Sequence, residues 1–216
     1  VVRLNATVPE VMVAGLPVIM LGRTPHIAWG GTNLHAASSD VYDVSDVPAS
    51  EITLRREVLR VRGASDHTMT IRETAYGPII SDLPALRRSR RVIALRWIGH
   101  RPSDEITALL QVARARSWPA FRAAVDLLAV PGQNLLYADR DGHIGKTMAA
   151  HLPARAETTP QSLLLPREAA ADWAQCVTGS ELPVVYDPPA GFIASANEKP
   201  EAAPVRIGWF FASGRR

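Results

Sequence analysis

A pair of adjacent amphipathic helices is the feature that most constrains how this chain can fold. Apolar residues recur at helical spacing twice within residues 103–128, first at Ile106, Leu109, Leu110 and Ala113 and then at Phe121, Ala124, Val125 and Leu128. Ser103 and Ser117 precede the two runs as candidate N-caps, and a Pro-Gly pair follows the second run. Since each helix has a single apolar face, we expect both to pack on a sheet.

Short strand-like segments lie before and after the helical pair. They are residues 17–21, 26–29, 56–62, 68–72, 92–97, 134–138 and 143–148, and several alternate apolar and charged residues as half-buried strands do. The last two flank an Asp-Gly pair, which is typical of a hairpin turn. Residues 152–189 contain six prolines and predict a looser surface excursion. We therefore expect residues 1–216 to form one strand-dominated α+β domain.

Composition argues against several classes of partner. The formal net charge is +3, and the main basic run, residues 87–91, has no interleaved aromatic residues, which favours a solvated loop over a nucleic-acid site. Cys176 is the only cysteine, so an internal disulfide cannot form. The longest apolar stretch, residues 11–21, is interrupted by Gly15 and Pro17 and is too short to span a bilayer. Neither nucleic acid nor a membrane is predicted as a partner.

Two short segments carry the most specific signal in the sequence. Residues 26–33 read HIAWGGTN, and residues 191–200 read GFIASANEKP. Between them follow YGPI at 76–79, LRW at 95–97, QNLLYAD at 133–139, GHIG at 142–145 and LPAR at 152–155. In order and spacing this series resembles the penicillin acylase family, a branch of the N-terminal-nucleophile hydrolases. The signatures of other common enzyme classes, such as G-x-S-x-G, H-E-x-x-H and the P-loop, do not occur.

The resemblance runs nearly end to end and implies both a fold and a reaction. The chain would be an internal fragment of the family's larger catalytic chain, forming the strand-rich and incomplete part of an αββα fold. The parent protein would be an amidase that removes the acyl group from an N-acylated small molecule. The substrate would be a β-lactam with an acyl side chain or an acyl-homoserine lactone. Such a protein would be periplasmic or secreted.

Two asparagines are candidate site residues by their position in this resemblance. Asn197 resembles the family's oxyanion-hole asparagine, whose side-chain amide donates to the tetrahedral oxyanion; an asparagine that caps a turn at a strand end is the alternative. The second donor would be the backbone N–H of Asn33, which any residue except proline could supply. Arg215 or Arg216 would correspond to an arginine that supports the asparagine or the nucleophile, or would belong to a solvated basic terminus.

The family's nucleophile is a serine at the terminus of the processed catalytic chain. Its own α-amino group, with a pKa of about 8, acts as the base. Val1 cannot fill this role, so the resemblance implies a nucleophile on a preceding segment and a separate smaller chain as partners of this one. We expect this chain alone to be inactive, and a stable core or interaction module is the alternative function. Trp29 and Thr32 are expected to be packing and turn residues.

Asp40 is the candidate metal ligand. It begins an Asp-Val-Tyr segment that stands where the family usually has Asp-Leu-Tyr, close to carboxylates that bind a structural calcium ion in some relatives. Residues 36–39 contain no acidic side chain, however, and calcium takes about six to eight oxygen ligands. No other cofactor is implied.

Overall fold

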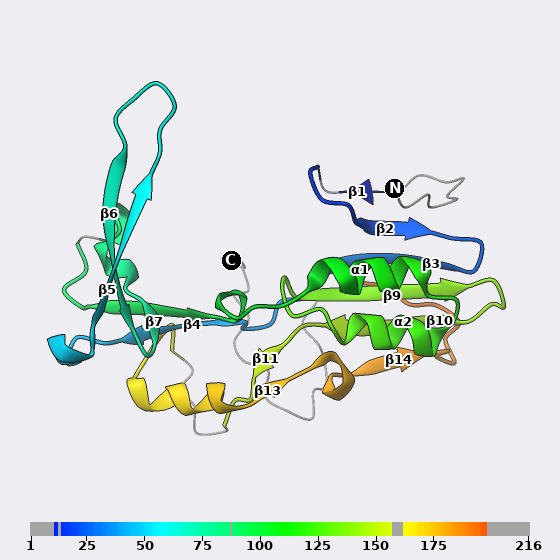
Figure 1. The fold of residues 1–216 in the computed structure, drawn as a ribbon. Coiled ribbons are helices and arrows are strands. Elements are labelled where there is room, and N and C mark those ends of the chain that lie inside the picture. The colour runs from blue at the N-terminus through cyan, green and yellow to red at the C-terminus, as the bar shows by residue number, and fades with distance from the viewer. Residues whose placement is uncertain (1–10, 13, 87, 157–161, 198–216) are drawn as a thin grey trace.

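The computed structural model describes residues 11–12, 14–86, 88–156 and 162–197. Its strands are β1 Val11–Met12, β2 Ile19–Arg23, β3 Ile27–Asn33, β4 Ser39–Asp43, β5 Thr53–Leu59, β6 His67–Thr74, β7 Gly77–Pro78, β8 Ile93–Trp97, β9 Gln133–Asp139, β10 Ile144–Ala149, β11 Leu152–Pro153, β12 Leu164–Leu165, β13 Cys176–Val177 and β14 Val184–Tyr186. Its α-helices are α1 Glu105–Arg114 and α2 Trp118–Val125, and its 3₁₀ helices are η1 Ala49–Glu51, η2 Ile80–Asp82, η3 Pro84–Leu86, η4 Ile98–His100, η5 Arg167–Ala174 and η6 Gly179–Glu181. The predicted α+β, strand-rich architecture is confirmed (Figure 1).

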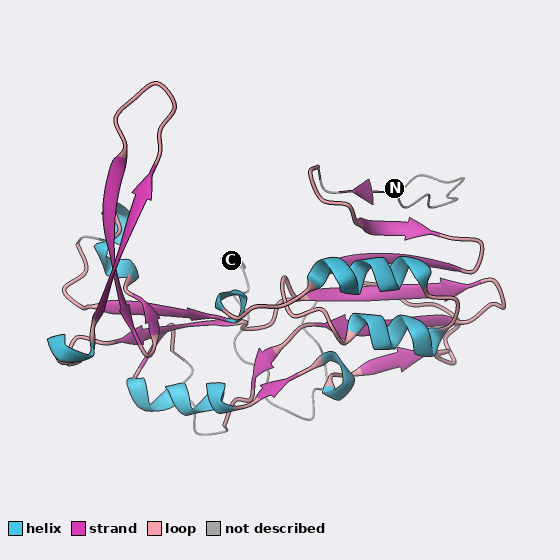
Figure 2. Cartoon of the chain, in the orientation of Figure 1, coloured by secondary structure: helices cyan, strands magenta, loops and turns pink. Residues whose placement is uncertain are grey.

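A six-stranded sheet with the order β1-β2-β3-β9-β10-β14 is the largest sheet of the described structure. Every neighbouring pair in it is antiparallel. In the β3–β9 pair, Thr32 lies opposite Asn134 and Asn33 lies opposite Gln133. Strands β9 and β10 form the predicted hairpin, and Gly142 in its turn has a φ of 96°, which a residue without a side chain adopts without strain. Both α-helices lie on one face of this sheet (Figure 2).

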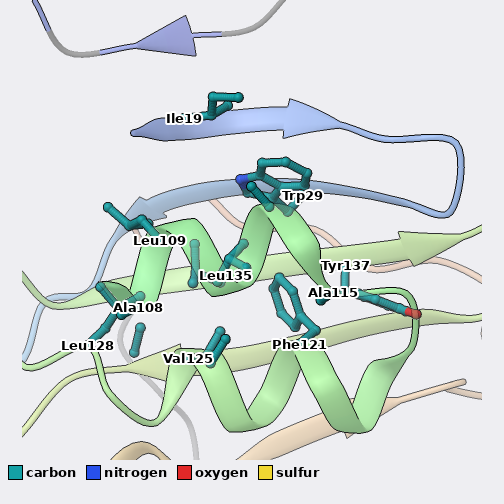
Figure 3. Close-up of a cluster of buried hydrophobic side chains, with 14 of the residues drawn as sticks. Ile19, Trp29, Ala108, Leu109, Ala115, Phe121, Val125, Leu128, Leu135 and Tyr137 are labelled. Carbon is teal, nitrogen blue, oxygen red and sulfur yellow. The ribbon is translucent and has the colours of Figure 1, made fainter. Parts of the chain in front are cut away.

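The helices and the sheet enclose an apolar core (Figure 3). Most of its buried side chains come from both helices and from β2, β3, β9 and β10, and they include Ile19, Trp29, Leu109, Phe121, Val125, Leu135 and Tyr137. The packing role predicted for Trp29 is therefore confirmed. A Cβ atom at Gly31 would lie 2.9 Å from Cδ2 of Leu135, so a larger residue at this position would require the Leu135 side chain to shift.

The helical pair is confirmed, but its details differ from the prediction. Asp104, not Ser103, caps α1, and its Oδ1 accepts a hydrogen bond of 2.9 Å from the N–H of Thr107. Ser117 occupies the N-cap position of α2 but makes no capping bond with its side chain. Ile106 is 43% exposed, so it does not belong to the buried face of α1.

A second region is built around the three-stranded sheet β12-β4-β8. Its core contains Tyr42, Ala94, Leu165 and Trp173. In the described part of the segment 152–189 the strands and 3₁₀ helices are short, but this part is not a surface excursion, because Leu165 and Trp173 are buried in this core and β14 joins the six-stranded sheet. The prolines of this segment do not prevent apolar residues between them from being buried, and Pro153 itself lies in β11.

Strands β5 and β6 form a hairpin arm that projects from the rest of the molecule, and β7 pairs with the end of β6 at the base of this arm (Figure 1). Leu54 is 66% exposed and Val58 is 54% exposed, although both belong to β5. The half-buried strand predicted at 56–62 is therefore wrong in its burial, since β5 is open to solvent on both faces. None of the helices in the described part of the chain is both long and apolar enough to cross a membrane.

Candidate functional site

Asn33 and Asn197, the two residues predicted to form the oxyanion hole, are in contact in the structure. Asn33 is the last residue of β3, and its backbone N–H donates a hydrogen bond of 2.9 Å to Oδ1 of Asn197. The two residues are 164 positions apart, and both are exposed. The fold thus brings a backbone donor and a side-chain amide together at one end of a central strand.

The segment that carries Asn197 follows β14 and contains no helix or strand in residues 187–197. Asn197 has a φ of 57°, in the left-handed region that asparagine tolerates better than most residues. This backbone conformation and the Oδ1 contact also match the turn-capping alternative. The chemical difference between the two interpretations is therefore whether the Asn197 amide ever donates to a ligand.

The side chain of Asn33 has its own partner on β9. Nε2 of Gln133 donates to Oδ1 of Asn33 over 3.2 Å, and Nδ2 of the buried Asn134 donates to the backbone oxygen of Asn33 over 3.4 Å. These contacts hold the peptide of Asn33 from the side of the neighbouring strand. They leave the backbone N–H of Asn33 directed at Asn197.

Thr32 makes a second contact between β3 and the Asn197 segment. The Oγ1 atom of Thr32 and the Oγ atom of Ser195 lie 2.6 Å apart, within hydrogen-bonding distance. Thr32 was expected to be a packing or turn residue, and Ser195 was not singled out at all. No local sequence pattern indicates this pair, because its members are 163 residues apart.

An apolar cavity of about 420 Å³ lies beside the same segment. It is lined by residues of β3, β9 and β10 and by the start of the Asn197 segment: Ala28, Trp29, Gly30, Leu136, Tyr137, Ala138, Ile144, Gly191, Phe192 and Ile193. A Cβ atom at Gly30 would meet no heavy atom within 4 Å, which shows that this position is open. The cavity can accept an apolar group but supplies no charged side chain for chemistry.

Asp40, the candidate metal ligand, lies elsewhere, in the core of the second region. Its carboxylate is buried and pairs with the guanidinium of Arg155, with Oδ1 and Oδ2 each 2.7 Å from a terminal nitrogen. Oδ2 also accepts hydrogen bonds from Nε1 of Trp173 at 2.6 Å and from the hydroxyl of Tyr42 at 3.1 Å. Burial, followed by the charge of Asp40, raises the pKa of Tyr42, so its hydroxyl remains a neutral donor.

This arrangement does not fit a calcium site. Both oxygens of Asp40 already face a cation, and calcium requires about six to eight oxygen ligands. Among the described residues no group of three or more His, Cys, Asp or Glu side chains could hold a metal ion. Arg215 and Arg216, the predicted supporting arginines, lie outside the described residues.

Comparison with known proteins points to one family. The sequence model of the family described as Penicillin amidase matches residues 11–216. Penicillin acylase 2 proenzyme of Pseudomonas sp. (strain SE83) is 23% identical over 202 residues, which are 86% of this chain and 26% of that protein. Penicillin G acylase of Escherichia coli is 25% identical over 205 residues, or 86% of this chain and 23% of that protein.

A relative with another named substrate and a solved structure agree with this result. Acyl-homoserine lactone acylase QuiP of Pseudomonas fluorescens is 25% identical over 203 residues, which are 87% of this chain and 25% of that protein. A thermostable penicillin G acylase from Alcaligenes faecalis has a similar fold, with a TM-score of 0.71 at 24% identity over 94% of this chain and 41% of that chain. The chain spans about a quarter of the length of the curated relatives it matches.

Proposed function

The chain belongs to the penicillin amidase family and has part of its αββα N-terminal-nucleophile hydrolase fold, and from this premise we propose that it is the oxyanion-binding part of an acyl-amide hydrolase. The observation that carries the proposal is the 2.9 Å contact between the Asn33 N–H and the Asn197 side chain. This contact brings together the two groups that would stabilise a tetrahedral oxyanion, the backbone N–H of Asn33 and the side-chain amide of Asn197, whose Oδ1 is the acceptor in the structure.

In the proposed reaction, a terminal serine on a segment outside this chain attacks the carbonyl carbon of the substrate amide. Its α-amino group takes the hydroxyl proton, and negative charge develops on the carbonyl oxygen. The N–H of Asn33 and the Nδ2 group of Asn197 donate to that oxygen. The protonated α-amino group then gives its proton to the leaving nitrogen, the tetrahedral species collapses and expels the amine, and water releases the acid from the acylated serine. Donors that are already in place stabilise this charge without reorganising at the moment of reaction.

One rearrangement is required before the two asparagines can act together. In the structure the Asn33 N–H donates to Oδ1 of Asn197, so the oxyanion must replace Oδ1 as its acceptor. Oδ1 and Nδ2 of Asn197 are bonded to the same carbon, so rotation of the side-chain amide turns Nδ2 towards the Asn33 N–H. The side chain must also move back far enough for the oxyanion to lie between the two donors. In the proposal, the turn-capping contact is thus the resting state of the site, and the two interpretations of Asn197 describe two states of one residue.

The substrate and the partners follow from the relatives. Their names include penicillin acylases and acyl-homoserine lactone acylases, so we propose as substrate either a β-lactam with an acyl side chain or an acyl-homoserine lactone. The partners in the proposal are the nucleophile-bearing segment and the smaller chain of the same precursor, in the periplasm or outside the cell. Since the chain spans about a quarter of its relatives' length, its function without these parts would be that of a stable core or interaction module.

Substitution of Asn197 in the full-length, processed protein tests the proposal. We expect Asn197→Ala to lower kcat by about 10²–10³-fold, the usual cost of losing one oxyanion donor. Release of acid from a chromogenic phenylacetyl amide and from an acyl-homoserine lactone would be measured in parallel, which also identifies the substrate class. Asn33→Ala is the matched control, because it keeps the backbone donor and should retain most of kcat, whereas Asn33→Pro removes that donor.

Two results would contradict the proposal. Wild-type kcat in processed Asn197→Ala would remove Asn197 from the reaction and leave the turn-capping role alone. Acid release by the isolated 216-residue chain would show that the nucleophile is not on a separate segment.

A further inference from the structure

The contact between Thr32 and Ser195 lies one residue from the Asn33–Asn197 contact on β3. We propose that these two residues, named here the hydroxyl pair, are positioning residues that hold Asn197 in register with the N–H of Asn33. The inference rests on the function proposed above and extends it to residues that do not touch the substrate. It is carried by the 2.6 Å distance between Oγ1 of Thr32 and Oγ of Ser195.

The position of the hydroxyl pair along both segments supports this role. Thr32 directly precedes Asn33, and Ser195 precedes Asn197 by two residues, so the two contacts join the same segments side by side. Thr32 belongs to β3, which the ladder with β9 fixes at the register Thr32 to Asn134. Ser195 belongs to a segment without regular secondary structure. The hydroxyl pair therefore fastens this irregular segment to a strand whose position is fixed.

The hydroxyl pair is half-buried, whereas Asn197 is exposed. A hydrogen bond shielded from water persists better than one that competes with solvent, so the anchor lies at Ser195 and the Asn197 side chain stays free to exchange Oδ1 for Nδ2. This division matches what the reaction needs, because the backbone must stay in place while the amide rotates. Small errors in the placement of a catalytic donor reduce the rate without preventing substrate binding.

Paired substitutions in the full-length, processed protein test the hydroxyl pair. Thr32→Val and Ser195→Ala each remove one hydroxyl, and we expect each to lower kcat by about tenfold, the equivalent of one hydrogen bond, with KM nearly unchanged. The double variant should be no slower than either single variant, since each already breaks the same bond. Thr32→Ser and Ser195→Thr keep the hydroxyl and should retain kcat. Inhibition by an alkylboronic acid, which forms a tetrahedral adduct with a serine, should weaken in parallel with kcat in the two hydroxyl-deleting variants.

Thr74→Val is the matched control on the hairpin arm. Thr74 is half-buried and uses its hydroxyl in a local turn with Tyr76 and Gly77, so this variant tests the loss of a threonine hydroxyl away from the site. We expect its kcat and its boronate inhibition constant to match those of the wild type.

The outcomes distinguish failure of the positioning role of the hydroxyl pair from failure of the proposed function. If Asn197→Ala loses kcat while Thr32→Val and Ser195→Ala keep it, the positioning role is overturned and the proposed function stands. If all three variants keep kcat, the proposed function fails as well. If Thr32→Val does not mature, Ser195→Ala alone decides, and failure of both to mature while Thr32→Ser and Ser195→Thr mature would make the hydroxyl pair a folding contact and overturn the inference.

Discussion

Beneath α1 and α2 most buried side chains are apolar, whereas around Asp40 the buried side chains include an ion pair. The first core contains residues such as Phe121 and Leu135. In the second, Asp40 and Arg155 have side chains only 7% and 5% exposed, and Trp173 and Tyr42 complete the hydrogen bonds of the carboxylate. The stability of the first core depends on how well its volume is filled, and that of the second depends on charge balance. Removing one side chain should therefore have different consequences in the two cores.

The candidate site lies where these two regions meet along the chain. Asn33 ends β3 of the six-stranded sheet, and Asp40 belongs to β4 of the three-stranded sheet. The guanidinium groups of Arg96 and Arg101 lie 5.1 Å and 5.7 Å from the centre of the Trp173 ring, so two further cations lie next to this second core. Four predictions test whether the distinction between the two cores holds, from the largest expected effect to the smallest.

Removing the cation of the second core should have the largest effect. Arg155→Met keeps much of the side-chain volume but leaves the Asp40 carboxylate buried without its partner, which costs about 3–5 kcal/mol in comparable pairs. Urea unfolding of the chain would measure the change in the free energy of unfolding. In the double variant Asp40→Asn/Arg155→Met the charge of Asp40 is removed together with its partner, so part of the loss should be recovered. The recovery should be incomplete, because the buried carboxylate of Asp172 also loses the guanidinium, which lies 3.9 Å from it. A loss in Arg155→Met that the second substitution does not reduce would show that packing, not charge, stabilises this core.

Truncating a side chain in the first core should lower the free energy of unfolding by somewhat less, and no second substitution should restore it. Leu135 is buried between β9 and the helices, and Leu135→Ala leaves a cavity whose cost is about 2–5 kcal/mol, depending on how far the core relaxes. The same urea experiment measures it. Ile106→Ala, on the exposed surface of α1, is the control and should change the free energy of unfolding by no more than about 0.5 kcal/mol. An equal loss at Ile106 would contradict the location of this core.

The sequence predicts the first core better than the second, for a physical reason. Helical spacing and the Asp-Gly turn are local signals, and α1, α2 and the β9–β10 hairpin form where they predict. The ion pair of Asp40 with Arg155 joins residues 115 positions apart, so a carboxylate that the resemblance made a metal candidate turned out to have a guanidinium partner. Strand β4 was missed as well.

In the candidate site, too, the family resemblance identifies some residues and only the structure reveals others. Asn33 and Asn197 could be named because their surroundings resemble a known family, and the structure places them in contact. Their roles remain a proposal. The bond between Thr32 and Ser195 could not be predicted, because two hydroxyl groups in segments 163 residues apart have no signature in a single sequence. The incomplete αββα fold implied by the resemblance is confirmed by the similarity to a solved penicillin G acylase.

An exposed ion pair provides a contrast with the buried one, and its effect should be small and dependent on pH. Nδ1 of His143 and Oδ2 of Asp187 lie 2.6 Å apart between β10 and the end of β14. The hydrogen bond to Asp187 raises the pKa of His143, and the hydrogen bond from the Ile144 N–H, followed by the one with His143, lowers the pKa of Asp187. The pair therefore stabilises the fold fully between the ordinary pKa values, about 3.9 for Asp and about 6.5 for His.

The stabilisation should be lost as the pH rises through the raised pKa of His143, and also as it falls through the lowered pKa of Asp187. We expect the difference in Tm between the wild type and Asp187→Asn to be largest near pH 5 to 6 and to shrink in both directions. Asparagine suits this substitution because Asp187 has a φ of 46°. A difference in Tm that does not change with pH would mean that the charge of the pair contributes nothing.

Calcium should have no effect on stability, which is the smallest change expected of the four. A ligand that binds only the folded state raises Tm by mass action, so a structural calcium ion would make Tm depend on calcium and on a chelator. In this structure the guanidinium of Arg155 already neutralises Asp40 with two contacts of 2.7 Å. Thermal scans of the chain in excess calcium and in EDTA should therefore coincide. If calcium raises the Tm of the wild type, the ion pair does not exclude the metal and the contrast between the two cores fails. If it raises only the Tm of Arg155→Met, the guanidinium itself is what keeps calcium from Asp40.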